Sequence, residues 1–542
     1  MNSPEIIETD SSVLVSSSQY LNHPGMREFF TTQFLRKNGK DRVPFTDNFG
    51  ISRSMNELRD KPAVEAWFER ERLTCPPLNR WMAEKHISTF TAEDLAKCPP
   101  GSLGGIYCEL VNQGFELDVG LNLQTRDWYE YAMARYSRNH DFEHILTGGQ
   151  FTFPGEYVPL YAMMTNTHTY MSPEFAAFIG LRSALASMRL LARAALHYPK
   201  SVWPFFECIA QGVKVGLDSD PIRLLKIDDL LNLPLEEARE KAGVRGAYEV
   251  QTEPWASHFL NPSDPEALAA DAHLPYIRRG TREVTTASSV PVSSSKYLND
   301  VRLREWTPVA MLRKAGPDYP DRAEYRHLET ILQGLRDRPR LDALTAKAVA
   351  DDAALGARLS QPCPVDGESL SKLPSGALGA ALLRRLRTNG DLDLLVSSEG
   401  TAWERLYRQV ALAEEILAVV LGGTGDALDG VMPGWAMVVS LYRDLDPDLA
   451  GELCNGRILG LLRFVSRTQI HYPRSWIAVA RAMRQGILIG QASAPLFSLP
   501  YEQVLALTPA EARERLAIRN WQPIDTRLAS EAYGERSLHA AA

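Results

Sequence analysis

Four residues in the first half of the sequence have the types and spacing of a metal site. His140 and His144 are four residues apart, Asp141 lies beside the first of them, and Glu156 follows His144 after eleven intervening residues. Two imidazoles one helical turn apart can reach the same cation. Two nitrogens and two carboxylate oxygens suit zinc, and iron, manganese and cobalt accept the same ligands. The sequence therefore predicts a divalent metal held by His140, Asp141, His144 and Glu156.

The elements that must position these ligands can be read from the surrounding residues. Residues 127–149 are predicted to form one helix that Gly148 ends, with His140 and His144 on the same face. A short loop with a Pro-Gly pair then returns the chain to the start of the next helix. We expect this return to bring Glu156 back to the two histidines.

An internal repeat organises the whole chain. SSSQYLN, which contains Tyr20, returns as SSSKYLN with Tyr297, an offset of 297 − 20 = 277 residues. LHYPKSVW, which contains His197, returns as IHYPRSWI with His471, an offset of 471 − 197 = 274 residues. Such self-similarity indicates a tandem duplication. We predict a first domain, a proline-containing linker, a second copy and a tail, at residues 1–245, 246–285, 286–520 and 521–542.

Both copies are predicted to be all-α. Segments such as FAAFIGLRSALASMRLLARAALHYP have apolar residues at spacings of three and four until Pro199. Segments in which apolar and polar residues alternate, as in a half-buried strand, are scarce. Short strands within 115–124 are the alternative.

The repeat also provides an internal comparison for the metal motif. With the offset of 274, the counterparts of the four predicted ligands are Glu414, Glu415, Ala418 and Gly430. All four ligands have changed together, as a shared role predicts, so we expect no such metal site in the second copy. His197 and Tyr198 persist as His471 and Tyr472, which indicates a role in holding the fold.

Composition excludes several classes of protein. The formal charge of −8 and the pI near 5.9 argue against a nucleic-acid partner. Six cysteines without a C-x-x-C pair fit a reducing cytoplasm. The acidic N-terminus lacks the features of a secretory signal, and no apolar run reaches roughly 18 residues. We expect a cytoplasmic protein whose membrane contact is peripheral at most.

At the motif the sequence resembles the coenzyme Q (ubiquinone) biosynthesis protein 4 family, which is marked by H-D-x-x-H followed by eleven residues and a glutamate. His140, Asp141, His144 and Glu156 match it position for position. The flanking PPGSLGGIY, ARYSRN and LTGG are also similar to the family. The resemblance covers most of residues 15–245 and extends more weakly over the second half.

The resemblance implies an all-helical protein that binds a divalent metal and a prenylated aromatic ring or quinone precursor. It implies a place on the inner face of the membrane and association with other quinone-biosynthesis enzymes. Members of the family are linked to loss of the ring carboxyl group at carbon 1, with hydroxylation there. Because relatives pair as homodimers, the tandem is expected to form a pseudo-dimer of two helical domains.

Three functions are compatible with the motif. The first is a metal-dependent decarboxylase of a prenylated hydroxybenzoate-like acid, a lyase or an oxidative enzyme, with Glu143 as acid or base and Arg135 pairing with a carboxylate. An exposed helix glutamate is the alternative for Glu143. The second is a non-catalytic, prenyl-lipid-binding scaffold with a structural metal. The third is an inverted-zincin metallopeptidase, because residues 140–144 read H-x-x-E-H.

Overall fold

The computed structural model describes eight stretches of the chain, and every regular element in them is a helix. These stretches are residues 16–37, 48–113, 124–255, 295–314, 321–360, 365–395, 399–422 and 430–524. Two isolated bridges, Ser102 with Pro234 and Gly149 with Val250, are the extended pairings described there. The all-α prediction is confirmed. The alternative of short strands within 115–124 falls almost entirely outside the described residues.

The described helices of the first half run from α1 to α12. They are α1 (Gln19–Asn22), α2 (Pro24–Glu28), the π-helical turn η1 (Phe29–Gln33), α3 (Asn48–Glu57), α4 (Lys61–Thr74), α5 (Pro76–Glu84), α6 (Ala92–Leu95), α7 (Leu103–Asn112), α8 (Trp128–Thr147), α9 (Tyr157–Tyr170), α10 (Pro173–His197), the 3-10 turn η2 (Pro199–Ser201), α11 (Trp203–Asp218), the 3-10 turns η3 (Ile222–Leu224) and η4 (Ile227–Asp229), and α12 (Leu235–Ala242).

The second half repeats this order. Its described helices are α15 (Lys296–Asn299), α16 (Val301–Leu312), α17 (Asp321–Leu335), α18 (Arg338–Asp351), α19 (Ala353–Ser360), α20 (Gly367–Ser371), α21 (Leu378–Asn389), α22 (Leu392–Leu395), α23 (Ala402–Val420), α24 (Val431–Asp444), α25 (Pro447–His471), the 3-10 turn η5 (Pro473–Ser475), α26 (Trp476–Ala492), the 3-10 turns η6 (Leu496–Ser498) and η7 (Tyr501–Gln503), and α27 (Pro509–Arg515). The helices therefore recur with the offsets found in the sequence. The predicted linker falls mostly on residues outside the described ranges, so the domain boundaries stay predictions.

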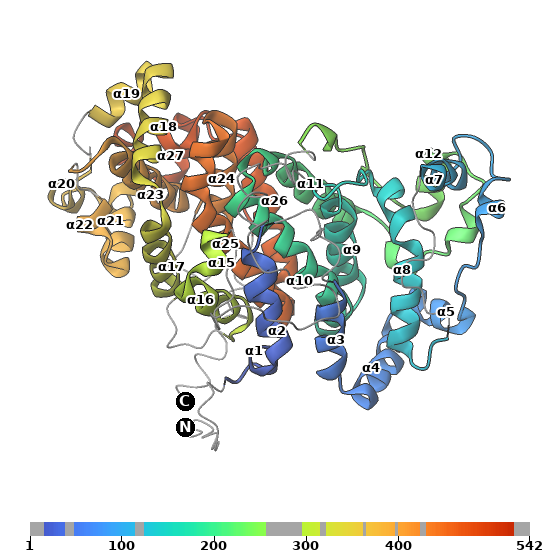
Figure 1. Cartoon of the computed structure of the whole chain (residues 1–542). Coiled ribbons are helices and arrows are strands. Elements are labelled where there is room, and N and C mark those ends of the chain that lie inside the picture. Colours follow the sequence, from blue (N-terminus) through green and yellow to red (C-terminus); the bar gives the residue numbers. More distant parts are fainter. Residues whose placement is uncertain are drawn as a thin grey trace, which may run out of the picture.

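The longest helix of each repeat lies at the centre of the molecule. α10 and α25 both have 25 residues, both begin at a proline and both end at a histidine that precedes Tyr-Pro. Proline suits the first helical turn, where its missing N–H is not needed, and disfavours helix in the residue before it. α10 packs against α25 and α11 against α26 near the middle of the molecule (Figure 1). One apolar core of buried side chains spans both repeats.

α10 is long and apolar enough by length and composition to cross a membrane. Its most apolar window has a mean hydropathy of 1.4, and 78% of that window is buried inside the protein. A buried core helix passes the same test, so this property is weak evidence for a membrane span.

Two serines join the repeats by a reciprocal pair of hydrogen bonds. The Ser18 hydroxyl donates to the carbonyl oxygen of Leu312 at 2.6 Å, and the Ser295 hydroxyl donates to that of Leu35 at 2.6 Å. Because Ser295 is the counterpart of Ser18 and Leu312 that of Leu35, each repeat gives the other the same contact. Such exchange is the property of an isologous interface.

Aromatic contacts between the repeats join matching pairs of helices, α11 with α24 and α26 with α9. Phe206 of α11 lies 6.3 Å from Trp435 of α24, centroid to centroid, and Trp476 of α26 lies 6.3 Å from Tyr161 of α9. Tyr161 and Trp435 are counterparts, since 435 − 161 = 274. The interface is thus built from matching helices on both sides, and its likeness to a homodimer of single-copy relatives stays a prediction.

The histidines that persist in both repeats have the structural role predicted for them. Nε2 of His197 lies 2.9 Å from the carbonyl oxygen of Leu35, and Nε2 of His471 lies 2.9 Å from that of Leu312. Each bond ties the end of a central helix to the first helical segment of its own repeat. Burial lowers the pKa of His197 to about 3, so this imidazole stays neutral in the folded protein.

Acid should destabilise the fold through His197. Its folded-state pKa of about 3 lies below the unfolded value near 6.5, so the unfolded chain binds the extra proton between these limits. The free energy of unfolding should therefore fall as pH drops below 6.5, by up to about 1.4 kcal/mol per pH unit. Urea denaturation between about pH 7 and 5 should show a smaller decline for His197→Gln than for a control at the exposed His327, His327→Gln. Equal declines would contradict the assignment.

Candidate metal centre

α8 carries both histidines of the motif and has the predicted extent. The Asp127 side chain accepts a hydrogen bond from the backbone N–H of Glu130 at the start of the helix. At the other end Gly148 adopts a left-handed conformation with φ of 87°. Glycine is favoured there because it lacks the Cβ atom that makes this conformation unfavourable for other residues. The prediction of one helix ended by Gly148 is confirmed.

The loop from Gly148 to α9 is too crowded for larger residues. A Cβ atom at Gly148 would lie 2.0 Å from the carbonyl oxygen of Tyr248, and one at Gly155 would lie 2.0 Å from that of Gln150. The backbone N–H of Val250 donates to the Gly148 carbonyl at 2.9 Å. The segment that contains Tyr248 and Val250, after the first repeat, therefore packs against the loop that leads to Glu156 and restricts its conformation.

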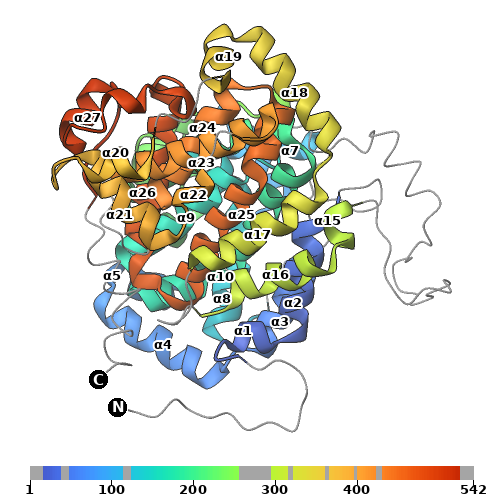
Figure 2. The same ribbon diagram turned by 90° about the vertical axis from the view of Figure 1, so that its left-hand side faces the viewer.

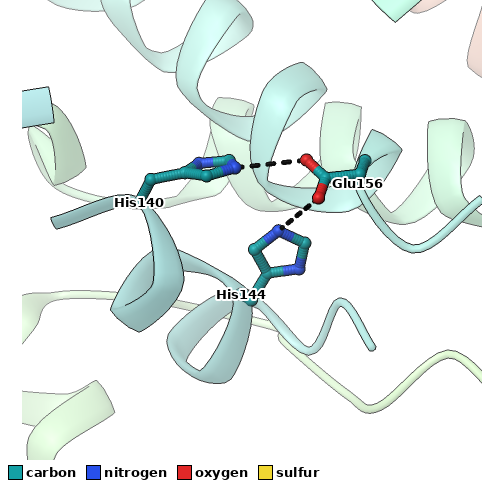
Figure 3. Close-up of side chains that lie close together, drawn as sticks. All are labelled: His140, His144 and Glu156. Atoms are coloured by element: carbon teal, nitrogen blue, oxygen red, sulfur yellow. Dashed lines mark hydrogen bonds and ion pairs between the residues drawn. The ribbon is translucent and has the colours of Figure 1, made fainter. Parts of the chain in front are cut away.

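Three of the four predicted ligands come together where α8 meets the start of α9. Nε2 of His140 lies 3.1 Å from one carboxylate oxygen of Glu156, and Nε2 of His144 lies 3.5 Å from the other (Figure 3). One ligand atom from each side chain falls within 4.8 Å of the other two. The side chains are well shielded, with exposed fractions of 21% for His140, 1% for His144 and 16% for Glu156. Two nitrogens and one carboxylate group thus face a common point.

One imidazole is hydrogen-bonded on its far side, and the other faces a carboxylate at longer range. Nδ1 of His144 lies 3.1 Å from the Gly149 carbonyl oxygen, and Phe151 stacks on the ring at 4.8 Å. Nδ1 of His140 lies 3.7 Å from the buried carboxylate of Glu143. For His144, an Nδ1–H directed at the Gly149 carbonyl leaves the lone pair on Nε2, the arrangement by which metal-binding histidines are usually held. The donor set therefore fits a divalent cation.

The cluster is also strongly coupled electrostatically. Burial opposes a charge on His140, but Tyr136, Glu143 and Glu156 together raise its pKa well above the ordinary value. Burial likewise opposes ionisation of Glu156, but His144 and His140 hold the pKa of its carboxyl below the ordinary range. Protons and a cation therefore compete for the same atoms, since a metal ligand must be deprotonated.

Asp141, the fourth predicted ligand, is turned away from the other three. One of its carboxylate oxygens accepts a hydrogen bond of 2.7 Å from the Tyr107 hydroxyl, which α7 supplies. Asp141 is not part of the group of three whose ligand atoms converge. The described geometry is thus a three-residue site, with an acidic neighbour held by a tyrosine.

The two predicted catalytic residues have different surroundings. Glu143 is 2% exposed and lies behind the His140 ring, so the alternative of an exposed helix glutamate is wrong. Arg135 is also buried, but its guanidinium donates to the Leu225 carbonyl, to the Tyr131 hydroxyl at 3.4 Å, and stacks over Trp81. These contacts hold α8 in place and involve no carboxylate of the cluster.

Arg223 is a neighbour of the site that the sequence did not indicate. It comes from η3, eighty residues after Glu143, and its guanidinium lies 5.3 Å from the centre of the Tyr136 ring. Its Nε donates to the Thr167 hydroxyl at 3.1 Å. Burial lowers the pKa of Arg223, and the nearby Glu143 opposes that shift. No motif surrounds this arginine, so only the fold reveals its position.

Comparison with known proteins gives limited guidance. No family model matches the sequence. No curated protein matches it either. Three solved chains do match, among them a crystal structure from Nostoc punctiforme provisionally described as a ubiquinone biosynthesis protein. It shares 18% identity with a TM-score of 0.31, over 41% of this chain and 97% of that chain. Likeness at this level assigns no family, and the function must be inferred from the chain's own residues.

The geometry makes a graded prediction for metal content. After loading with zinc or iron(II) and desalting, wild-type protein should retain close to one metal per chain, measured by plasma mass spectrometry. His140→Ala and His144→Ala should lose it, because each removes one of three converging donors. Asp141→Asn should retain most of it, because Asp141 bonds to Tyr107.

A histidine outside the cluster provides the control. His86 pairs with Asp228 at 2.8 Å, so His86→Ala should bind metal as the wild type does. Loss of metal in Asp141→Asn equal to that in His144→Ala would show instead that Asp141 leaves Tyr107 and becomes a fourth ligand. Wild-type protein without metal would refute the site.

Proposed function

We propose that the first repeat is a metal-dependent enzyme of the ubiquinone-biosynthesis type. It would decarboxylate a prenylated or related hydroxybenzoate-like aromatic acid, with or without coupled hydroxylation. The observation that carries the proposal is the convergence of three, and not four, protein ligands on one point. Catalytic metal sites keep a position open for substrate or water, whereas structural sites are closed by four protein ligands.

Each residue of the site has a definable part in this chemistry. His140, His144 and Glu156 would hold the metal, and their two-histidine, one-carboxylate set is common to zinc hydrolases and non-haem iron oxygenases. A bound cation supplies Lewis-acid stabilisation of negative charge on a carboxylate or phenolate oxygen. Glu143 and the Gly149 carbonyl would fix the ring orientation of the two histidines. The substrate class comes from the resemblance of the motif, not from the geometry.

A non-catalytic prenyl-lipid-binding scaffold that organises other quinone-biosynthesis enzymes is the second candidate. In that case the metal would be structural, and its removal would unfold the first repeat. The displacement of Asp141 toward Tyr107 weakens this reading, because it leaves three protein ligands where a closed site needs four.

The inverted-zincin reading requires Glu143 to serve as a base at the open side of the metal. Glu143 instead faces Nδ1 of His140, whereas Glu156 lies beside Nε2 of the same ring. The two nitrogens are on different edges of the imidazole, so the Glu143 carboxylate lies behind the ligand. This placement disfavours a peptidase.

Turnover and folding should be measured together on the full chain. With zinc or iron bound, wild-type protein should release carbon dioxide from a prenylated hydroxybenzoate under aerobic or anaerobic conditions, and chelation should abolish release while circular dichroism stays unchanged. Release only in air would identify the oxidative reaction. Unfolding on chelation, without turnover, would support the scaffold, and cleavage of peptides would support the zincin.

Glu143→Gln should distinguish positioning from acid–base catalysis. If Glu143 orients His140, its loss should weaken metal affinity by about 10- to 100-fold and leave most of the turnover number at saturating metal. A general acid or base would instead cost roughly 10²- to 10⁴-fold in turnover number with metal affinity unchanged. Metal titration and steady-state rates would separate the two. Glu130→Gln, on the same helix but paired with Arg126, is the matched control.

A further inference from the structure

The second repeat contains a cavity where the first repeat has its metal cluster. The cavity has a volume of about 870 Å³. The counterparts of the four predicted ligands are Glu414, Glu415, Ala418 and Gly430, and all four line it. Loss of the metal ligands therefore did not fill the site with larger side chains. A volume in this range is typical of sites for small organic molecules.

The walls combine an apolar surface with charged groups. Figure 2 looks onto this part of the molecule, where α21 packs against α23 and α17 against α25. The apolar surface includes Ala411, Val419, Leu461 and Phe464. The lining also holds seven arginines and five carboxylates, and no lysine or histidine. One of these arginines, Arg463, pairs with Glu324 outside the lining, which leaves an excess of one positive charge.

Four of the lining arginines are specific to the second repeat. They are Arg384, Arg385, Arg408 and Arg457, at the positions of Glu109, Leu110, Ala134 and Ser183 in the first repeat. The positions follow from the offset of 378 − 103 = 275 residues in α21 and of 274 residues in α23 and α25. The second repeat thus gained positive charge around the same place where it lost metal ligands.

The two glutamates that replace His140 and Asp141 form ion pairs with two of these arginines. Glu414, at the position of His140, pairs with Arg457 at 2.8 Å. Glu415, at the position of Asp141, pairs with Arg385 at 2.6 Å. The first repeat places metal-ligand atoms at this point. The second repeat instead places guanidinium groups there, and carboxylates hold them in fixed orientations. Arginine offers paired N–H groups that match a carboxylate or phosphate.

Three buried polar atoms in the cavity lining lack a hydrogen-bond partner among the described residues. They are the Tyr325 hydroxyl, one carboxylate oxygen of Glu329 and the Trp403 indole N–H. Buried polar groups in folded proteins are nearly always hydrogen-bonded, to protein, water or ligand. Two donors and one acceptor in this lining suit a ligand that carries polar groups beyond its anionic head.

We propose that this cavity binds an amphipathic organic anion, with its carboxylate or phosphate head toward the arginines and its apolar body against Leu461 and Phe464. The second repeat is then a ligand-binding copy, not only a support for the first. The site is independent of the metal cluster and of the function proposed for it.

Calorimetric titration of the full, chelator-treated chain tests this directly. Decanoate and decyl phosphate are the probes, and decanol is the neutral control of equal chain length. One site per chain and an affinity at least tenfold higher for an anion than for decanol are expected. A preference for decanoate would identify a carboxylate ligand, and one for decyl phosphate a phosphate ligand. Equal affinities for all three probes, or no binding, would overturn the proposal.

Three variants locate the site. Arg408→Ala restores the first-repeat residue and should weaken anion binding at least tenfold. Ala411→Phe should block the cavity without changing charge and abolish binding of every probe. Arg387→Asn, which removes an exposed charge on α21 outside the lining, should bind as the wild type does. Circular dichroism and urea midpoints verify folding, and unchanged affinity in both folded lining variants would refute the cavity as the site.

Discussion

The packing of α10 against α25 joins the two repeats through their longest helices. Both helices carry arginines that are buried near their C-terminal ends. Nε of Arg193 donates to the Gln33 carbonyl at 2.6 Å, and Nε of Arg467, its counterpart, donates to the Ala310 carbonyl at 2.8 Å. A buried guanidinium must be hydrogen-bonded, because an unpaired charge is unfavourable in an apolar core. These bonds fix the first helical segments over the central pair, and the reciprocal serine bonds then join the two repeats.

On this shared frame the two copies differ in the side chains around the predicted metal ligands. In the first repeat, α8 and α9 direct two imidazoles and a carboxylate to a common point. In the second, α23 presents Glu414 and Glu415 to arginines beside a cavity. The side chains at this place differ, while the helices that carry them keep the same order in both copies.

The loop before α9 shows how closely the first site depends on its surroundings. Gly148 has no room for a Cβ atom, because the Tyr248 carbonyl lies against it. Gly422 is the counterpart of Gly148 in the second repeat. A Cβ atom at Gly422 would have no atom of the described residues within 4 Å. The segment after the first repeat thus constrains the loop that delivers Glu156. Such a constraint is expected where a carboxylate must be held in register with two imidazoles.

The sequence alone determined the helical class, the tandem repeat, the extent of α8 and the three converging side chains. These depend on local signals: apolar spacing, a helix-ending glycine, the i, i+4 relation of His140 and His144, and recurrence at a fixed offset. Tertiary structure alone decided that Asp141 turns to Tyr107, that Glu143 is buried behind His140, and that Arg223 approaches Tyr136. The cavity of the second repeat could not be inferred from the sequence either. Some of these contacts join residues of helices that pack together only in the folded chain. The others depend on the direction in which a side chain points. Sequence spacing encodes neither the packing of distant helices nor the direction of a side chain.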